Sequence, residues 1–316
     1  MLSSKRPRIA ISAASSFTGS WIARAFHAAG WKVLPVCSQP ASAYRGIRRK
    51  RIELVQECVS VHFDCEASDG SLAAWIKEHR PQIWIHHHHF MEDFRAVHYD
   101  LRRALSIGLG SLPGILDAFA AGDGVGVIYS GTYFEQSERG QAWQDSTPTP
   151  YAQSKTQVWE ALCFGCEKRE LGLSKIVIPN PVGPWENQDR LIPCMIDHAE
   201  SGAALQLRSP RQLVDNIPID ELAALYVESA RQLLSARDQK VIRPSGRISS
   251  ALNWIEFAGK ELLEKRLGLP PCKLEYERSS VKACDDTLTF TNPGSEAKPI
   301  DWNNFWDSYA ANLRRR

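Results

Sequence analysis

The first half of the chain alternates short apolar runs with longer amphipathic segments. Apolar runs of strand length lie at Arg8–Ser12, Trp31–Val36, Cys58–Asp64, Gln82–Ile85, Gly124–Thr132 and Ser174–Ile178. Helical patterns between them end at Ala29, cover Ser68–His79 and Val97–Ala121 with a break near Pro113, and begin again at Pro150. This alternation predicts an α/β domain over residues 1–180, with a doubly wound, mostly parallel sheet covered by helices.

Beyond Gln188 the alternation loosens, and the pattern predicts mainly helices. They are expected over Asp189–Ser201, from Asp220 to Leu234, over Ser250–Leu267 and from Asp301 onward. In the last of these, the aromatic side chains of Trp302, Phe305, Trp306 and Tyr309 have the spacing of one buried helix face. We therefore expect a smaller C-terminal lobe over residues 181–316, with returning elements such as 214–245 packed on the first domain.

Composition says more about the possible functions of the protein than about its fold. The 316 residues are 43% hydrophobic and carry a net charge of +2, which gives no general reason to expect a nucleic acid or membrane partner. No apolar run is long enough to cross a bilayer, and the basic N-terminus lacks a signal-peptide core. The eight cysteines show no disulfide framework, so we expect a cytoplasmic protein whose Cys163-x-x-Cys166 pair consists of buried thiols.

The candidate chemistry centres on a tyrosine and a lysine at the start of one helix. Thr149 is a suitable N-cap and Pro150 a suitable first residue, which places Tyr151 and Lys155 four residues apart on a single face. A nearby cation stabilises a phenolate and lowers the pKa of the phenol. Ser130 stands at the end of the preceding strand, 21 residues earlier. The alternative is an ordinary helix start with a surface tyrosine and a solvated lysine.

A second motif follows the first strand. The turn Ala13–Gly19 consists mostly of small residues and leads into a helix, as in units that bind a dinucleotide diphosphate at the helix N-terminus. A tight turn without a ligand is the alternative. Four adjacent histidines, 86–89, end the fourth strand; adjacent strand residues point to opposite faces, so a metal site is not expected there.

Ser130 followed by Tyr151-x-x-x-Lys155 resembles the short-chain dehydrogenase/reductase superfamily, and the chain length and long intervening loop resemble its extended branch. That branch contains nucleotide-sugar epimerases, dehydratases and 4-keto-reductases. The resemblance implies a Rossmann-like fold, with Tyr151 as general acid/base, Lys155 lowering its pKa and holding the nicotinamide ribose, and Ser130 donating to the reacting oxygen. It also implies a homodimer formed through the helix Leu112–Ala121 and the Tyr151 helix.

The resemblance also implies a cofactor site, although with altered residues. Ala13, Ser16 and Gly19 occupy the three glycine positions of the family loop, and histidines stand where the strand under the cofactor has small residues. The implied cofactor residues are Ala13, Ser16, Phe17, Thr18, Gly19, Ser38, Arg45, Asp64, Cys65, His87, His88, His89, Ile178 and Pro179. No acid follows the second strand, and a basic loop begins at Arg45, so we expect NADP rather than NAD. A solvated basic loop is the alternative.

The implied substrate is a nucleotide sugar. Asn180 matches the family turn that reaches a diphosphate, and Thr132, Tyr133, Arg208 and Arg211 complete the candidate substrate residues. The family's diphosphate arginine falls on Val214 and its relay asparagine on Gly108. We expect an epimerase or 4-keto-reductase of surface polysaccharide or deoxysugar biosynthesis. The alternatives are a reductase of a non-sugar carbonyl and a degenerate, non-catalytic scaffold.

A 4,6-dehydratase is not expected. The dehydratases of this family carry an Asp-Glu pair directly after the strand-end hydroxyl, where this chain has Gly131 and Thr132. Neither residue supplies the additional acid and base that expulsion of water needs. Glu135 follows three residues later, and nothing in the sequence indicates that it points inward.

Overall fold

The described residues form two compact units. The computed structural model describes residues 6–94, 96, 98–138, 148–276 and 299–314. Unit 1 runs to Ile178 and takes back Leu222–Arg243, whereas unit 2 comprises Pro179–Glu221 and the residues from Pro244 onward. The predicted division into a cofactor domain and a substrate lobe remains a prediction, because this division describes compactness and not binding.

Unit 1 is built on a parallel six-stranded sheet. Its strands are β1 (Arg8–Ser12), β2 (Lys32–Val36), β3 (Ile83–His86), β4 (Gly126–Thr132), β5 (Gly172–Ile178) and β9 (Lys240–Ile242). The order is β2-β1-β3-β4-β5-β9, and every neighbouring pair is parallel. The chain winds outward from β1 in both directions, which creates a crevice at the carboxyl ends of β1 and β3. The predicted doubly wound sheet is confirmed.

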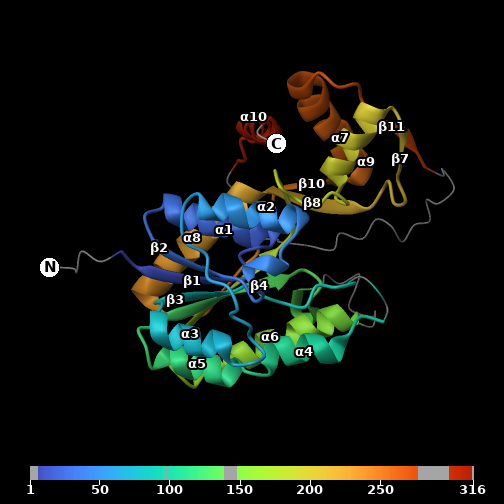
Figure 1. Ribbon diagram of the computed structural model, residues 1–316. Coiled ribbons are helices and arrows are strands. Elements are labelled where there is room, and N and C mark those ends of the chain that lie inside the picture. Colours follow the sequence, from blue (N-terminus) through green and yellow to red (C-terminus); the bar gives the residue numbers. More distant parts are fainter. Residues whose placement is uncertain (1–5, 95, 97, 139–147, 277–298, 315–316) are drawn as a thin grey trace. The chain divides into compact units, whose positions relative to one another are not determined.

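Helices cover both faces of this sheet (Figure 1). One layer contains α1 (Phe17–Ala28), α2 (Gly46–Gln56) and most of α8 (Ile219–Ala236), and the other contains α3 (Ser71–His79), α4 (Leu101–Leu109), α5 (Leu112–Ala120) and α6 (Pro150–Glu167). The strands are buried from both sides, so they are apolar along nearly their whole length: Ile9, Ile11 and Trp84 are fully buried.

Two predicted elements differ in the structure. The expected strand Cys58–Asp64 is wrong, because Cys58 and Val59 donate to the Val55 carbonyl that closes α2, and a single bridge between Val36 and His62 remains. The expected basic loop after Arg45 is wrong as well, since most of it forms α2.

The long helical pattern before residue 121 is divided as expected. It forms α4 and α5, which separate at Gly110 and Ser111, and its expected start at Val97 lies outside the described residues. Gly108 packs against α6 so closely that a Cβ would lie 2.5 Å from Val158. An asparagine at the relay position therefore has no room there.

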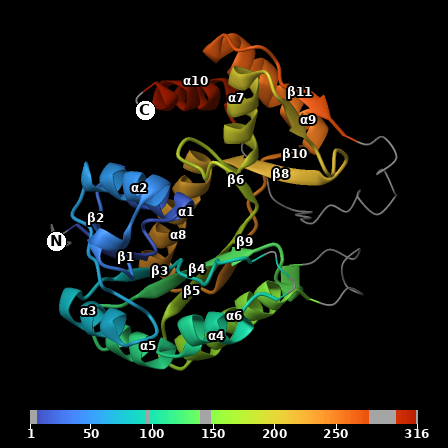
Figure 2. The same cartoon turned by 45° about the vertical axis from the view of Figure 1, so that its right-hand side comes forward.

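The described residues of unit 2 form two small sheets and, besides the start of α8, three helical segments. Figure 2 shows this unit from a second side. Strands β6 (Asn180–Val182), β8 (Leu213–Pro218) and β10 (Arg247–Ser250) form one sheet, and β7 (Ala204–Gln206) and β11 (Lys273–Glu275) form the other. The helices are α7 (Leu191–Ser201), α9 (Ala251–Ala258) with its π-helical continuation Gly259–Leu267, and α10 (Trp302–Leu313). Trp306 and Tyr309 lie in an apolar core, as predicted. No described helix has the length and apolar character that a membrane crossing requires.

Candidate active site

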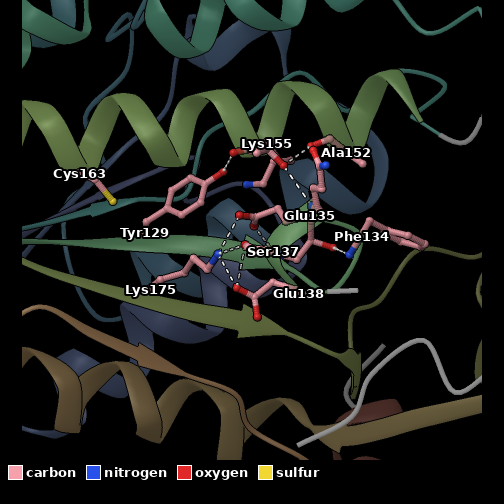
Figure 3. A network of polar contacts seen from close by, with 12 residues as sticks. Tyr129, Phe134, Glu135, Ser137, Glu138, Ala152, Lys155, Cys163 and Lys175 are labelled. Atoms are coloured by element: carbon pink, nitrogen blue, oxygen red, sulfur yellow. Dashed lines mark hydrogen bonds and ion pairs between the residues drawn. The ribbon is translucent and has the colours of Figure 1, made fainter. Parts of the chain in front are cut away.

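The predicted catalytic residues lie on β4 and α6. The Thr149 hydroxyl accepts the Ala152 N–H at 3.2 Å and Pro150 is the first helical residue, so α6 begins where the sequence predicts. Tyr151 and Lys155 are both buried, as is Ser130 on β4. The Tyr129 hydroxyl donates to the Lys155 carbonyl at 2.9 Å, which fastens the helix to the strand (Figure 3).

The lysine and the tyrosine have different partners. Lys155 Nζ donates to the Ser130 carbonyl at 2.6 Å and lies over the Tyr129 ring. Burial lowers the pKa of Lys155 to about 8 although the Glu135 carboxylate opposes this shift. Burial first and Glu135 second raise the pKa of Tyr151, against a hydrogen bond with Thr132. The prediction that Lys155 lowers this phenol's pKa is not met in the structure.

Ser130 has two side-chain partners that the sequence did not reveal. Its Oγ lies 2.7 Å from His87 Nδ1 and 2.7 Å from the Tyr226 hydroxyl of α8. The other nitrogen of the same imidazole, Nε2, lies 3.0 Å from Ser16 Oγ. Tyr226 is fully buried and 96 residues away in sequence, and no motif surrounds it.

A buried ion cluster stands beside these residues (Figure 3). Lys175 Nζ of β5 lies 2.9 Å from Glu135 and 2.7 Å from Glu138, and Arg243 pairs with Glu138 at 2.6 Å. Glu135 Oε1 also accepts the Thr132 N–H at 2.7 Å. The expectation that nothing turns Glu135 inward is therefore wrong: its side chain is fully buried, and Lys175 is the reason. We call Lys175, Glu135, Glu138 and Arg243 the ion cluster.

The turn between β1 and α1 retains the shape of a diphosphate loop. Ala13 adopts a φ of 56°, a strained value for a residue with a Cβ, as the missing glycine implies. Ser16 caps α1 by accepting the Gly19 N–H at 2.9 Å, and a Cβ on Gly19 would lie 2.5 Å from the Ala13 carbonyl. Phe17 and Thr18 form the first turn of α1, which contains no acidic residue. This helix N-terminus therefore fits a diphosphate.

The residues predicted for the adenosine side of the cofactor site are Ser38, Arg45, Asp64 and Cys65, and their cofactor role remains a prediction. Ser38 follows β2 and is half-buried, Asp64 has a left-handed φ of 58°, and the Cys65 N–H donates to the Cys37 carbonyl at 3.1 Å. Arg45 donates to the carbonyls of Ser42 and Tyr44, both in its own segment.

Arg48, which the sequence did not distinguish from its basic neighbours, reaches the β1–α1 turn, and Arg51 lies over the Phe17 ring at the start of α1. Arg48 Nη2 donates to Ser15 Oγ at 3.0 Å, and the Arg48 guanidinium lies over the Tyr44 ring. A helical register could have found it, because only one face of α2 turns toward that loop.

The histidines have separate partners. His88 Nδ1 lies 3.0 Å from Ser12 Oγ, and His89 Nε2 lies 2.9 Å from Ser154 Oγ. Burial and the charge of Lys155 lower the pKa of His87 to about 3 and that of His88 to about 4, so both are neutral at pH 7. Among the described residues, no group of three or more His, Cys, Asp or Glu could hold a metal ion.

Of the remaining predicted residues, Thr132 ends β4, Tyr133 follows it, and the others lie at the end of β5 or in unit 2. Ile178 ends β5 and Pro179 follows it. Asn180 donates to Asn216 at 2.6 Å and accepts from Arg190 at 2.8 Å, so its amide is held within unit 2. Arg208 and Arg211 are exposed. A substrate role for any of these residues remains a prediction.

Comparison with known proteins adds the fold family. No model of a known protein family matches the chain, and no curated protein matches it in sequence. Solved structures do match over nearly its full length. A UDP-N-acetylglucosamine 4-epimerase from Methanobrevibacter ruminantium, with UDP-N-acetylmuramic acid, has a TM-score of 0.74 at 16% identity and covers 98% of this chain and 99% of its own. A UDP-glucose 4-epimerase from Stenotrophomonas maltophila with NAD bound gives 0.72 at 16% identity and the same coverage.

A third structure, the enzyme WbmG of Bordetella bronchiseptica with NAD, has a TM-score of 0.71 at 15% identity and covers 100% of this chain and 96% of its own. The chain thus has the fold of extended short-chain dehydrogenase/reductase enzymes, and its structural neighbours include UDP-sugar 4-epimerases. At these identities the likeness establishes the fold, and the activity has to be argued from the site.

Proposed function

We propose that the protein is an NAD(P)-dependent nucleotide-sugar 4-epimerase or 4-keto-reductase. The observation that carries this proposal is that Ser130 on β4 and Tyr151 and Lys155 on α6 are each buried, with Lys155 bonded to the Ser130 carbonyl, at a sheet of dinucleotide-binding topology. The neighbours' sugar-nucleotide substrates and the polar residues beyond β5 support a nucleotide sugar as the substrate class. We assign the reaction to deoxysugar or surface polysaccharide synthesis on the same ground.

The chain's own residues divide the chemistry as follows. The nicotinamide of a bound cofactor supplies the hydride acceptor or donor. Tyr151 exchanges the proton with the sugar oxygen, and Ser130 donates a hydrogen bond to that oxygen. Lys155 supplies positive charge next to both residues, and a bound substrate that turns its ammonium from the Ser130 carbonyl toward Tyr151 would lower the phenol's pKa.

The residues present fit a dinucleotide at its diphosphate end, and they favour NADP. Ala13, Ser16 and the first turn of α1 would hold the diphosphate, with Gly19 packed beneath them. The neighbours contain NAD, but this chain places the Arg48 guanidinium at the β1–α1 turn, where it can pair with a 2′-phosphate. We therefore expect Arg48→Ala to weaken NADP binding more than NAD binding, and Arg45→Ala to have a smaller effect.

Dehydration remains excluded from the proposal for a revised reason. Glu135 does point inward, yet one of its oxygens accepts the Thr132 N–H and the other pairs with Lys175. A carboxylate with both oxygens bonded is poorly placed to remove a proton from a sugar carbon. Gly131 has no side chain with which to assist it.

The test combines products with a matched pair of variants. The protein is incubated with NAD(P)(H) and a panel of UDP-hexoses and their 4-keto derivatives, and the products are analysed by mass spectrometry and chromatography. A mass-neutral epimer or a reduced sugar is expected, and Tyr151→Phe should abolish it while the exposed Tyr276→Phe retains it. A product lighter by one water, or full activity of Tyr151→Phe, would contradict the assignment.

A non-catalytic scaffold is the second candidate, and the strained Ala13 and the histidine-filled strand end favour it. Titration of NAD(P)(H) watched by tryptophan fluorescence separates the two, because a scaffold with a collapsed site would bind neither dinucleotide. A reductase of a non-sugar carbonyl would bind the cofactor but turn over no UDP-hexose.

We further propose a homodimer formed through α5 and α6. Phe164 on α6 is 71% exposed, and it lies on one of the two helices that the resemblance assigns to the interface. Phe164→Glu should convert a dimer into a monomer in analytical ultracentrifugation.

The seven described cysteines are free, in keeping with a reducing cytoplasm.

A further inference from the structure

One imidazole connects the two ends of the proposed cofactor site. His87 Nε2 lies 3.0 Å from Ser16 Oγ, and its Nδ1 lies 2.7 Å from Ser130 Oγ. Ser16 is the N-cap of α1, where the diphosphate is expected, and Ser130 is the residue that would hold the reacting oxygen. The reach from the diphosphate site to the reacting centre is therefore spanned by a side chain of the protein itself.

A dinucleotide has to make the same connection. In this topology the diphosphate lies at the N-terminus of the first helix, and the rest of the molecule crosses the carboxyl ends of the central strands. His87 follows β3 directly, at the carboxyl end of a central strand. An imidazole bonded to both serines and a nicotinamide nucleoside that runs from one to the other compete for the same space.

We propose that His87 sets the affinity for the dinucleotide, which binds only when this imidazole leaves Ser16 and Ser130. The inference rests on the proposed function, since it presumes that a nicotinamide dinucleotide is the ligand. It has a consequence for the order of events: departure of the imidazole removes one partner from Ser130, so the hydroxyl becomes available to the reacting oxygen when the cofactor enters.

Local contacts limit the cost of this displacement to the two hydrogen bonds of the imidazole. Ser16 Oγ still accepts the Gly19 N–H, and Ser130 Oγ still bonds the Tyr226 hydroxyl, so neither serine is left without a partner. His87 is only half-buried and lies beyond the last residue of β3, so its side chain can turn away without breaking a sheet hydrogen bond. The imidazole is neutral at pH 7, so no ion pair is lost.

The test measures binding and not turnover. Isothermal titration calorimetry with NADP and NAD is carried out on the full-length protein and on His87→Ala, His88→Ala and Tyr226→Phe. His88→Ala removes the neighbouring imidazole, which bonds Ser12 and does not connect the two serines. Tyr226→Phe removes the other partner of Ser130 and leaves His87 in place. Thermal unfolding of each variant verifies that it is folded.

His87→Ala should bind the dinucleotide about tenfold more tightly than the unmodified protein, the effect of one or two net hydrogen bonds no longer broken. His88→Ala and Tyr226→Phe should show no such gain. If His87→Ala does not fold, Ser130→Ala provides the second measurement, because it releases one end of the imidazole and should tighten binding by a smaller factor.

The outcomes separate the two proposals. Binding by the unmodified protein with equal or weaker binding by His87→Ala would overturn this inference and leave the proposed function standing. Failure of the folded His87→Ala and Ser130→Ala variants to bind either dinucleotide would overturn both. An equal gain in His88→Ala would show that any loss of histidine bulk suffices, and would also overturn the specific role of His87.

Discussion

The interior of unit 1 beside Ser130 and the interior of unit 2 differ in kind. In unit 1, the ion-paired side chains of Lys175 and Glu135 are fully buried, and that of Glu138 is almost fully buried. In unit 2, the rings of Trp254, Trp306 and Tyr309 fill the core with contacts between aromatic faces and edges. Aromatic packing stabilises a fold directly, whereas a buried ion pair often does no better than an apolar replacement of the same volume.

This difference indicates what the ion cluster is for. Stability alone does not explain why unit 1 keeps three charges in its interior, and one of them, Glu135, acts on the electrostatics of the proposed site. The Glu135 carboxylate raises the pKa of Tyr151 and opposes the lowering of the Lys155 pKa, so the cluster acts on both proposed catalytic groups. The core of unit 2 also borders a buried carboxylate, Glu186, which accepts from Tyr309 and pairs with Arg190, but the rings around Trp306 are uncharged, so their variants should behave as packing variants.

The largest effect is expected from Lys175→Met. It removes the ion-pair partner of Glu135 and leaves Glu138 paired with Arg243 alone, and it should lower the free energy of unfolding by about 3–5 kcal/mol in urea titrations. Arg49→Met is the control, because its pair with Glu53 is about half exposed and should contribute no more than about 1 kcal/mol. A loss below about 1 kcal/mol for Lys175→Met would mean that the ion cluster is not held as charges.

Lys155→Met should raise the free energy of unfolding, whereas Lys175→Met lowers it. Burial depresses the pKa of Lys155 from 10.5 to about 8, so the unfolded chain binds more protons in this range and stability rises with pH between about 8 and 10.5. The gain in stability that comes from deprotonating Lys155 is therefore complete above pH 10.5 and is lost as the pH falls through 8. The methionine variant should therefore gain up to about 3 kcal/mol at pH 7. Unfolding measured from pH 6 to 10.5 should also show a flatter profile, and an unchanged profile would contradict the depressed pKa.

The smallest effect is expected from Trp306→Phe in unit 2. The ring is fully buried, and among the described residues its indole N–H has no hydrogen-bond partner, so phenylalanine loses volume without losing a bond. A cost of about 1–2 kcal/mol, equal at pH 6 and pH 9, is expected from chemical denaturation. A strong pH dependence would show that the two interiors are not as different as their composition indicates.

What the sequence could predict was local. The start of α6, with its N-cap Thr149 and first-turn Pro150, follows from residues next to one another, as does the positioning of Tyr151 and Lys155 on one face. The strand–helix alternation located β1 to β5 of the sheet but not β9, which lies at Lys240–Ile242. The amphipathic pattern likewise gave the buried aromatic face of α10.

What the sequence could not predict depends on distant partners. Lys175 is 40 residues from Glu135, and Tyr226 is 96 residues from Ser130, so neither pairing leaves a trace in local spacing. The missed helix α2 has a cluster of arginines in place of a clear apolar stripe, and the false third strand satisfied an apolar pattern whose backbone was needed to close α2. In both cases the apolar pattern was a weaker guide than helical hydrogen bonding along the chain itself.

Gly131 shows how one absent side chain is tied to the residues around it. A Cβ at this position would lie 2.9 Å from Glu135 Oε1 and 3.0 Å from Lys175 Cγ. The ion pair and any larger residue after Ser130 therefore exclude each other. The aspartate that the related dehydratases carry at this place would meet both a steric clash and a like charge. A change from glycine to aspartate at position 131 therefore requires the Lys175–Glu135 pair to shift or to be lost, which couples the two positions.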